Sequence, residues 1–492
     1  MTLRLYNTLT RCKEPFAPQR PPKVGIYVCG VTVWDSTHLG HARAAIVFDT
    51  IVRYLRHRGF QVTYVKNYTD VDDKIIRRAN QDGVPWTAVA EKYIAEYSRD
   101  MERLGTVKPD VEPRASAHIG DMIAMIETLM ARGLAYETQG DVFYAVRTCA
   151  DYGQLSGKKI EELAVGARVE ANEAKRDPLD FALWKRAKPD EPSWPSPWGP
   201  GRPGWHIECS AMSTKYLGQP IDIHGGGRDL IFPHHENEIA QAEGASGTPF
   251  VRCWMHNGSL TIDSEKMSKS LGNYFRTSEA LQQYDAEVIR YFLLSSHYRS
   301  PLDFSTMALT DMGRAVTRFY DATGRLGQAT AGAFPAAPPK TLPDEARPLV
   351  RRLQTFHEEL HEALDDDLNT PKVFGMMFEL VRDLNRYLDT QHGRHGPIHH
   401  WIQMAWSTLR QQCHRILGLF GSDAADFRER MKAMALGKRG VDHATVEQLI
   451  AQRNTARRTK DFATADQIRD QLTAMGVSFK DRADGTTEWH VE

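Results

Sequence analysis

The sequence predicts an α/β protein in which a parallel-sheet domain is split by an insertion and followed by an α-helical bundle and a small C-terminal domain. Three observations support this fold class. Residues 24–67 carry a strand–helix–strand pattern, residues 189–198 hold four prolines that neither a helix nor a central strand accommodates, and helical periodicity dominates beyond residue 270. A chain of 492 residues is long enough for about three domains.

The sheet domain begins with a predicted strand, helix and second strand. Residues 24–29 form a short apolar run that ends at Gly30, as a buried strand does. Between residues 38 and 58 the apolar side chains recur at helical spacing, and Gly59 supplies a stop signal. Residues 61–67 are then predicted to form the second strand. This βαβ unit predicts a parallel sheet of the Rossmann type, which is a nucleotide-binding architecture.

The pattern changes between about residues 114 and 204, and we interpret this segment as an insertion into the sheet domain. Residues 205–209 are expected to lead the chain back into the sheet. A further strand is predicted at residues 221–224, followed by a turn of three glycines. Phe232 and Pro233 are then expected to open a helix.

The C-terminal half is predicted to be mainly helical. Residues 329–343 are rich in alanine and proline and are interpreted as a linker, while residues 345–389 and 400–419 carry long helical periodicities. A compact tail follows from about residue 433. Five domain ranges are predicted. The first half of the sheet domain spans residues 1–113, the insertion spans 114–204, and the second half of the sheet domain, with a loop rich in lysine and serine, spans 205–305. The helical bundle spans 306–432 and the C-terminal domain 433–492.

Composition excludes several classes of protein. Hydrophobic residues make up 41% of the chain and charged residues 25%, as in ordinary globular proteins. The formal charge of −1 excludes a uniformly basic surface, so any contact with nucleic acid has to come from local patches. No run of about 20 apolar residues predicts a membrane span, and no signal peptide is apparent. The six cysteines lack the spacing of a disulfide framework, which favours a reducing cytoplasm.

Two short motifs predict a site for the triphosphate of ATP. The first, His38-Leu39-Gly40-His41, lies at the start of the first predicted helix, where unpaired backbone N–H groups and the helix dipole favour an anion. The second, residues 266–270, contains Lys266 and Lys269 in a loop-like sequence. Imidazole and ammonium groups fixed in place can stabilise the charge that develops on departing phosphates.

A second group of side chains is chemically suited to a metal ion. Cys29 ends the first predicted strand, Cys209 follows the insertion, and His234 and Glu238 stand four residues apart, so they share one face of a helix. Thiolate, imidazole and carboxylate are all ligands of zinc. From the residues alone, His235 and Glu236 are equally possible ligands, and a buried cysteine can also serve as a small hydrophobic residue.

Four longer motifs resemble the cysteinyl-tRNA synthetase family, and the two ATP motifs resemble the signature sequences of class I aminoacyl-tRNA synthetases. The resemblance extends from about Leu5 to at least Gly418. The departures are few: Leu39 and Trp34 replace an isoleucine and a tyrosine that the family usually has, and Glu488 precedes the last tryptophan of the tail. The four motifs are residues 29–35, 67–74, 204–210 and 232–238.

The resemblance implies a role for specific residues. His38, His41, Lys266 and Lys269 would be catalytic, and the ATP-binding positions would be Gly40, Gly227, Asp229 and Lys269. One Zn²⁺ per chain would be held by Cys29, Cys209, His234 and Glu238. The cysteine pocket would be shaped by Thr69, Trp205 and His224.

The resemblance also implies partners. They are ATP with Mg²⁺, L-cysteine and tRNA(Cys), handled by a cytoplasmic monomer that does not associate with membranes. The tail matches an anticodon-binding module, so its basic cluster would contact RNA phosphates rather than form only a solvated helix face. This cluster consists of Arg453, Arg457, Arg458 and Lys460.

Two alternative functions remain open at this point. One is a ligase that joins cysteine to an amino sugar, and the long region after Leu293 disfavours it, since such relatives are shortened at the C-terminus. The other is a catalytically silent tRNA-binding protein, which the intact residues of the two ATP motifs disfavour.

Overall fold

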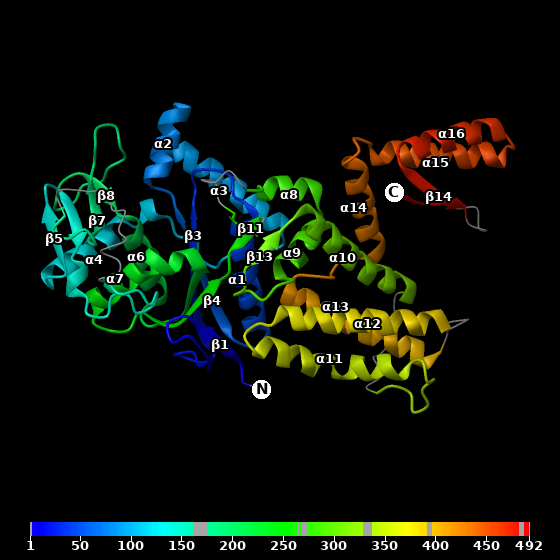
Figure 1. Cartoon of the computed structure of the whole chain (residues 1–492), viewed down its shortest axis with the longest axis horizontal. Coiled ribbons are helices and arrows are strands. Elements are labelled where there is room, and N and C mark those ends of the chain that lie inside the picture. Colours follow the sequence, from blue (N-terminus) through cyan, green and yellow to red (C-terminus); the bar gives the residue numbers. More distant parts are fainter. Residues whose placement is uncertain are drawn as a thin grey trace.

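A parallel sheet of four strands forms the centre of the N-terminal half of the protein (Figure 1). The structure is a computed structural model that describes residues 2–160, 175–262, 265–267, 274–327, 337–390, 396–481 and 487–491. The strands pair in the order β10, β9, β3, β4, and every neighbouring pair is parallel. They are β3 (Lys23–Thr32), β4 (Gln61–Thr69), β9 (Ile221–Gly227) and β10 (Val251–Asn257).

Helices cover both faces of this sheet because each strand is apolar on both sides. Alternate residues of a strand point to opposite faces. Val28 packs in the core cluster that contains α1 (Leu39–His57), whereas Tyr27 packs in the cluster that contains α6 (Trp205–Leu217) and α7 (Glu236–Ser246). The predicted βαβ unit is therefore confirmed, with α1 connecting β3 to β4.

The segment after the insertion differs from the prediction. Residues 205–209 were expected to lead into the sheet, but they form the first turns of α6, which begins after Gly204. The helix is favoured because Ile207, Ala211 and Met212 recur at helical spacing and are buried. His234 lies in a short turn at Ile231–His235, and the regular helix α7 starts only at Glu236.

The insertion contains a second, antiparallel sheet that the sequence does not predict. Its strands are too short to produce a clear alternation of apolar and polar residues. The first two are joined by a two-residue turn at Gln139 and Gly140, which have φ angles of 57° and 90°. The sheet consists of β5 (Ala135–Thr138), β6 (Asp141–Tyr144), β7 (Phe181–Arg186) and β8 (Gly201–Pro203), and α4 (Ile119–Ala131) packs nearby.

Smaller elements complete the N-terminal half. A two-stranded hairpin precedes the main sheet, two helices follow β4, and a small sheet adjoins α1. These elements are β1 (Arg4–Asn7), β2 (Cys12–Pro15), α2 (Asp73–Asp82), α3 (Trp86–Arg103), β11 (Leu260–Ile262), β12 (Glu265–Lys266) and β13 (Leu302–Phe304).

The C-terminal half is helical, as predicted, and ends in a small domain that projects from the bundle (Figure 1). The predicted linker lies largely outside the described residues. The helices of this half before the C-terminal domain are α8 (Thr277–Gln283), α9 (Ala286–Leu294), α10 (Thr306–Leu326), α11 (Arg347–Asp365), α12 (Thr370–Thr390), α13 (Pro397–Leu417) and α14 (Ala424–Gly437). The C-terminal domain consists of α15 (His443–Arg458), α16 (Phe462–Ala474), β14 (Val477–Asp481) and β15 (Thr487–Val491).

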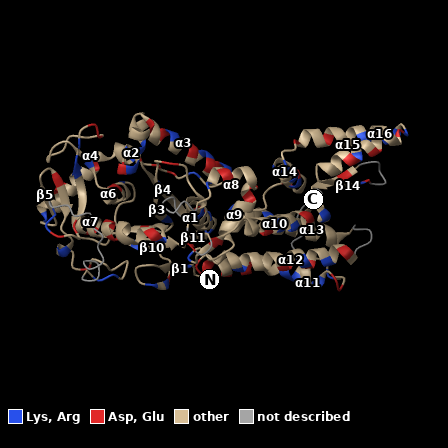
Figure 2. Ribbon diagram, turned by 45° about the horizontal axis from the view of Figure 1, so that its top comes forward, with Lys and Arg blue, Asp and Glu red and all other residues tan. Residues whose placement is uncertain are grey.

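Acidic and basic residues occur together in every domain. Figure 2 shows acidic and basic residues interspersed along the sheet domain, the bundle and the C-terminal domain, in agreement with the formal charge of −1. None of the described helices combines the length and the apolar character that a membrane crossing requires.

A buried ion pair joins the sheet domain to the bundle. Arg290 of α9 donates to the carboxylate of Asp49 on α1, and both side chains are 1% exposed. Arg290 also donates to the carbonyl oxygen of Leu417 at the end of α13, and Asp49 accepts from the backbone N–H of Val107 at 2.7 Å. One interaction therefore connects α1, α9 and α13.

We expect Asp49→Ala to lower the free energy of unfolding by about 3–5 kcal/mol, because the Arg290 guanidinium would stay buried without its counter-charge. The measurement is urea denaturation followed by tryptophan fluorescence. Asp311→Ala is the matched control, since Asp311 pairs with Arg314 in solvent, at 53% and 69% exposure; its loss should cost less than about 1 kcal/mol. Equal effects of the two substitutions would contradict the structural role of the buried pair.

Candidate functional site

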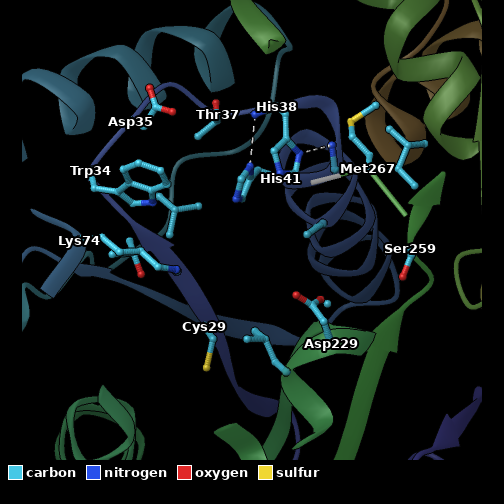
Figure 3. A pocket seen from close by; sticks show the side chains of 18 of the residues that line it. Cys29, Trp34, Asp35, Thr37, His38, His41, Lys74, Asp229, Ser259 and Met267 are labelled. Atoms are coloured by element: carbon cyan, nitrogen blue, oxygen red, sulfur yellow. Dashed lines mark hydrogen bonds between the residues drawn. The ribbon is translucent and has the colours of Figure 1, made fainter. Parts of the chain in front are cut away.

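A cavity of about 640 Å³ opens at the carboxyl edge of the parallel sheet (Figure 3). The chain runs from β3 through α1 to β4 in one direction and from β9 through α7 to β10 in the other, so the order of strands reverses between β3 and β9. Open α/β sheets bind ligands at such a switch point, because the loops after the two strands diverge there. The cavity lies between these loops and the start of α1.

The two histidines of the first motif lie at the N-terminus of α1 and line the cavity (Figure 3). The Nδ1 atom of His38 accepts from the backbone N–H of Gly40 at 3.1 Å, and Nδ1 of His41 accepts from the N–H of His38 at 3.2 Å. Because both Nδ1 atoms accept, each neutral ring carries its proton on Nε2. Any side chain at Gly40 would clash with the His38 ring, since its Cβ would lie 2.8 Å from Cε1.

The second motif is only partly described. Met267 is 2% exposed and forms part of the cavity wall opposite Lys74 (Figure 3). Only the backbone of Lys266, in β12, is described, and Lys269 lies outside the described residues. Gly227 and Asp229, at the end of β9, also line the cavity. A Cβ at Gly227 would lie 2.4 Å from Oδ1 of Asp229, so a larger residue there would force the Asp229 side chain to move.

The predicted metal-binding residues converge beside this cavity. One ligand atom from each of Cys29, Cys209, His234 and Glu238 lies within 4.8 Å of the others. The two Sγ atoms are 3.6 Å apart, and the Oε1 atom of Glu238 is 3.4 Å from Sγ of Cys29 and 3.1 Å from Nε2 of His234. The donors come from β3, α6, the turn before α7 and α7 itself.

Burial sets the protonation of this cluster. Removal from water raises the pKa of the Cys29 and Cys209 thiols and of the Glu238 carboxyl, because it disfavours their charged forms. It lowers the pKa of His234, so this imidazole stays neutral and keeps a lone pair for a metal. A cation bound between these donors would instead lower the pKa of the thiols and of the carboxyl, because it stabilises their charged forms.

The two alternative ligands have different environments. Glu236 is 1% exposed, and its carboxylate accepts from the backbone N–H groups of Gly153 and Ser156 at 3.0 and 2.8 Å. It therefore anchors the insertion, and it belongs to no possible metal-binding group among the described residues. His235 belongs to a second possible set, with Cys29, His224 and Glu238. Its Nδ1 atom is 2.7 Å from His256, which in turn contacts Thr8.

Two of the three expected pocket residues, Trp205 and His224, contact members of the metal cluster. Trp205 stacks on His234 with a centroid distance of 4.3 Å and lines the cavity. Thr69 donates from Oγ1 to the buried carboxylate of Glu208 at 2.9 Å, and His224 is fully buried with Nε2 3.5 Å from Sγ of Cys29. Thr69 and His224 are not among the residues that line the cavity.

Several cavity residues have no role assigned to them by the sequence motifs. Lys66 of β4 is buried between this cavity and a second one of about 360 Å³, and burial lowers its pKa to about 8. The wall formed by α2 contributes Lys74, Arg77, Arg78 and Gln81. Their spacing of three and four residues indicates that they share one face of a helix. Only the fold shows that this face lines the cavity.

The four cations of the basic cluster in the tail differ in burial and in their partners. Arg453 is 7% exposed and makes two hydrogen bonds to the carboxylate of Asp481, at 2.9 and 3.0 Å. Arg457 pairs with the same carboxylate. Arg453 therefore holds α15 against β14, contrary to the expectation that it contacts RNA, while Arg458 and Lys460 are exposed.

Comparison with known proteins identifies similar families along the chain. Residues 15–314 match the family described as tRNA synthetases class I (C) catalytic domain, residues 359–421 match the DALR domain, and residues 443–489 match the cysteinyl-tRNA ligase anticodon binding domain. The cysteine–tRNA ligases of Pelobacter propionicus and Geobacter sulfurreducens are 51% and 50% identical to this chain, over 100% of both sequences. A Mycobacterium tuberculosis methionyl-tRNA synthetase in complex with methionyl-adenylate has a similar fold, with a TM-score of 0.64 and 16% identity over 83% of this chain and 93% of that chain.

Gly30, beside Cys29, is restricted by the neighbouring strand. A Cβ there would lie 1.5 Å from the carbonyl oxygen of Asn67, at the irregularity in the pairing of β3 with β4. We expect Gly30→Ala to lower the free energy of unfolding by about 3 kcal/mol or more, measured by urea denaturation. Gly375→Ala in α12 is the control: nothing lies within 4 Å of its Cβ, and it should stabilise the protein by about 0.5–1 kcal/mol. A neutral Gly30→Ala would show that β3 can move away from β4.

Proposed function

This chain belongs to the cysteine–tRNA ligase family of class I synthetases, and we propose how its residues carry out the ligation of L-cysteine to tRNA(Cys). The family match along the whole chain is the observation that carries the function. In the first step, the carboxylate of cysteine attacks the α-phosphate of ATP, so that pyrophosphate leaves and cysteinyl-adenylate forms. In the second, a ribose hydroxyl of the terminal adenosine of tRNA attacks the activated carbonyl, and AMP leaves.

His38 and His41 would donate from Nε2 to phosphate oxygens of ATP at the N-terminus of α1, where the helix dipole also favours the anion. The backbone N–H groups of residues 39–42 already donate to Phe275 and His38, so the two imidazoles are the donors at this helix start. Lys266 and Lys269 would approach the same phosphates from the signature loop. Gly40 allows close packing at the helix start, and Gly227 with Asp229 would hold the adenosine ribose. Mg²⁺ would accompany ATP, as hard cations bind phosphate oxygens.

The carboxylate nucleophile is ionised at neutral pH, so no side chain has to remove a proton from it. The residues of this site therefore act by positioning the reactants and by stabilising charge on the departing pyrophosphate.

Cys29, Cys209, His234 and Glu238 would hold one zinc ion. Two thiols, an imidazole and a carboxylate form a typical zinc donor set, and two thiolates on one tetrahedral zinc lie about 3.8 Å apart, close to the 3.6 Å between the Sγ atoms. Among the described residues, Oε2 of Glu238 has no hydrogen-bond partner, as expected for a ligand atom whose partner is a metal. When bound, zinc supplies a soft Lewis acid that accepts the thiolate of the substrate, which a serine hydroxyl matches poorly.

The surrounding side chains would shape the pocket for cysteine. Trp205 packs flat against His234 and fixes the orientation of that ligand. Glu208 holds the hydroxyl of Thr69 in place, and His224 packs beside Cys29. These contacts limit the room beside the metal cluster, so a small side chain with sulfur is the substrate that the pocket favours.

The C-terminal region would bind the anticodon end of tRNA, because residues 443–489 match an anticodon-binding domain. This match also disfavours the amino-sugar ligase. Arg457, Arg458 and Lys460 are exposed. Arg457 pairs with Asp481, so Arg458 and Lys460 are the cations that would meet phosphates. The five domain ranges given above, a monomeric state and a cytoplasmic location, where ATP and tRNA are available, are part of this proposal.

The function is tested by cysteine-dependent exchange of pyrophosphate into ATP, followed by charging of tRNA(Cys) in the same preparation. Both reactions are expected. Exchange without charging would support the amino-sugar alternative, and the absence of both would support a silent tRNA-binding protein.

Lys269→Ala should lower the rate of pyrophosphate exchange at least about 100-fold while changing cysteine binding little, because negative charge on the leaving pyrophosphate grows in the transition state. Exchange kinetics and equilibrium binding of cysteine separate the two effects. Lys372→Ala, at an exposed lysine of α12, is the control for removing one positive charge. A normal exchange rate in Lys269→Ala would remove this loop residue from the mechanism.

Cys209→Ser should reduce the zinc content of the purified protein to well below one ion per chain and abolish cysteine activation. Cys253→Ser is the control, since Cys253 is also buried but belongs to neither metal cluster. Atomic absorption measures the zinc. Retention of one zinc ion in Cys209→Ser would instead assign the metal to the set that contains His224 and His235, because Cys209 is absent from that set.

Adding cysteine to the cobalt-substituted protein should change its absorption spectrum, whereas serine should not, since only a thiolate joins the ligands of the metal. An unchanged spectrum with cysteine would show that the metal only stabilises the fold.

A further inference from the structure

One wall of the active-site cavity is a basic helix face for which the adenylation step provides no role. Four residues of α2 line the cavity at positions that share one face of the helix. The opposite face, formed by Ile75, Ile76 and Ala79, is buried. The helix is thus fixed by its apolar face and presents its polar face to the cavity. The four residues are Lys74, Arg77, Arg78 and Gln81.

The carboxylates of α2 do not neutralise all of this face. Asp73 pairs with Lys185 and Arg202 of the insertion, and Asp82 pairs with Arg78. Lys74 and Arg77 are exposed, and neither forms an ion pair with any carboxylate that the structure describes. Two positive charges therefore remain available at the cavity wall.

This wall lies away from the proposed triphosphate site. Figure 3 shows Lys74 beside Trp34, across the cavity from Met267 and Ser259, with His38 and His41 at the start of α1 between them. The ammonium group of Lys74 is 6.0 Å from the centre of the Trp34 ring. Cys29 lies on the same side of the cavity as Lys74 (Figure 3), so the basic face borders the region where the cysteine carbonyl has to react.

We propose that the basic face of α2 binds phosphates of the unpaired 3′ end of tRNA and holds that strand while its terminal adenosine enters the cavity. The inference rests on the proposed function, in which the hydroxyl of this adenosine attacks the activated carbonyl. The nucleotides that precede it have to leave the cavity past an exposed wall. Between Lys74 and Gln81 the helix rises by about 10 Å, a length that matches about three phosphates of a stacked strand.

Phosphate contacts of this kind position an RNA strand without reading its bases. Lys74 and Arg77 are therefore positioning residues for the transfer step and not for the formation of the adenylate. Gln81, on the same face, adds a neutral hydrogen-bonding group at the outer end of α2.

The test is the double variant Lys74→Ala with Arg77→Ala in the full-length protein. We expect pyrophosphate exchange to stay within about twofold of the unchanged protein, while KM for tRNA(Cys) rises about tenfold or more. Loss of two phosphate contacts should also reduce the slope of log Kd against log salt by about 1.4, at about 0.7 per contact on a single strand. The control is Arg351→Ala with Lys372→Ala, two exposed cations of α11 and α12, which should change neither value.

A trimmed tRNA locates the contact. The unchanged protein and the double variant should bind tRNA(Cys) lacking its last three nucleotides with equal affinity, because the contacted phosphates are gone. Lys74→Arg with Arg77→Lys should restore charging, since it keeps both charges. Gln81→Lys should tighten binding of intact tRNA and steepen its salt dependence. Because this substitution adds a phosphate contact, its result is informative even if the protein folds poorly with alanine at positions 74 and 77.

Four results would overturn the inference. A fall in pyrophosphate exchange equal to the fall in charging would assign the α2 face to ATP. An unchanged KM and salt slope would show that the strand takes another route, and a persisting difference with trimmed tRNA would place the contact elsewhere on the RNA. Absence of charging by the unchanged protein would reject the proposed function and this inference with it.

Discussion

The pairing of β3 with β9 is the constraint on which the rest of the site depends. These strands are separated by the whole insertion, yet they pair in parallel, with Tyr27 opposite His224 and Val28 opposite Gly225. The pairing places Cys29 next to His224 and brings the turn after β9 to the start of α1. It also creates the reversal of strand order at which the cavity opens. The residues proposed to bind phosphate, ribose and metal therefore lie in one crevice because two distant strands share hydrogen bonds.

A fully buried carboxylate then organises the inner end of that crevice. Glu238 lies among two thiols and two imidazoles, and burial alone would disfavour its charge. A metal ion would supply the compensating charge, which explains how such a polar group can be accommodated behind an apolar sheet. Glu236, two residues earlier, is equally buried but satisfies backbone N–H groups of the insertion. Two neighbouring carboxylates thus have separate tasks: one anchors the inserted segment and the other faces the donor cluster.

Charged residues of the same type also divide between structure and recognition. Arg290 and Arg453 are buried and fully engaged with Asp49 and Asp481, so they fix the bundle and the C-terminal domain. Lys74 and Arg77 are exposed beside the cavity, and Arg458 and Lys460 are exposed in the C-terminal domain. A tRNA that spans from the cavity to this domain would meet cations at both ends. Such a distribution reconciles RNA binding with an overall charge close to zero.

The fold class, the βαβ unit and the helical C-terminal half could be predicted from the sequence alone, since these features depend on local periodicity. The two contiguous motifs could also be found there, and their binding of ATP remains a proposal. The sequence also named Cys29, Cys209, His234 and Glu238, but through resemblance, because spacing alone does not reveal that β3, α6 and α7 meet. Only the tertiary structure decided that residues 205–209 are helical, that the insertion holds a sheet, that Glu236 is an anchor and that Arg453 is buried. The physical reason is that burial and partner choice depend on residues far apart along the chain. A short strand, a carboxylate or an arginine has the same local sequence signal whether it faces water, a backbone amide or an opposite charge.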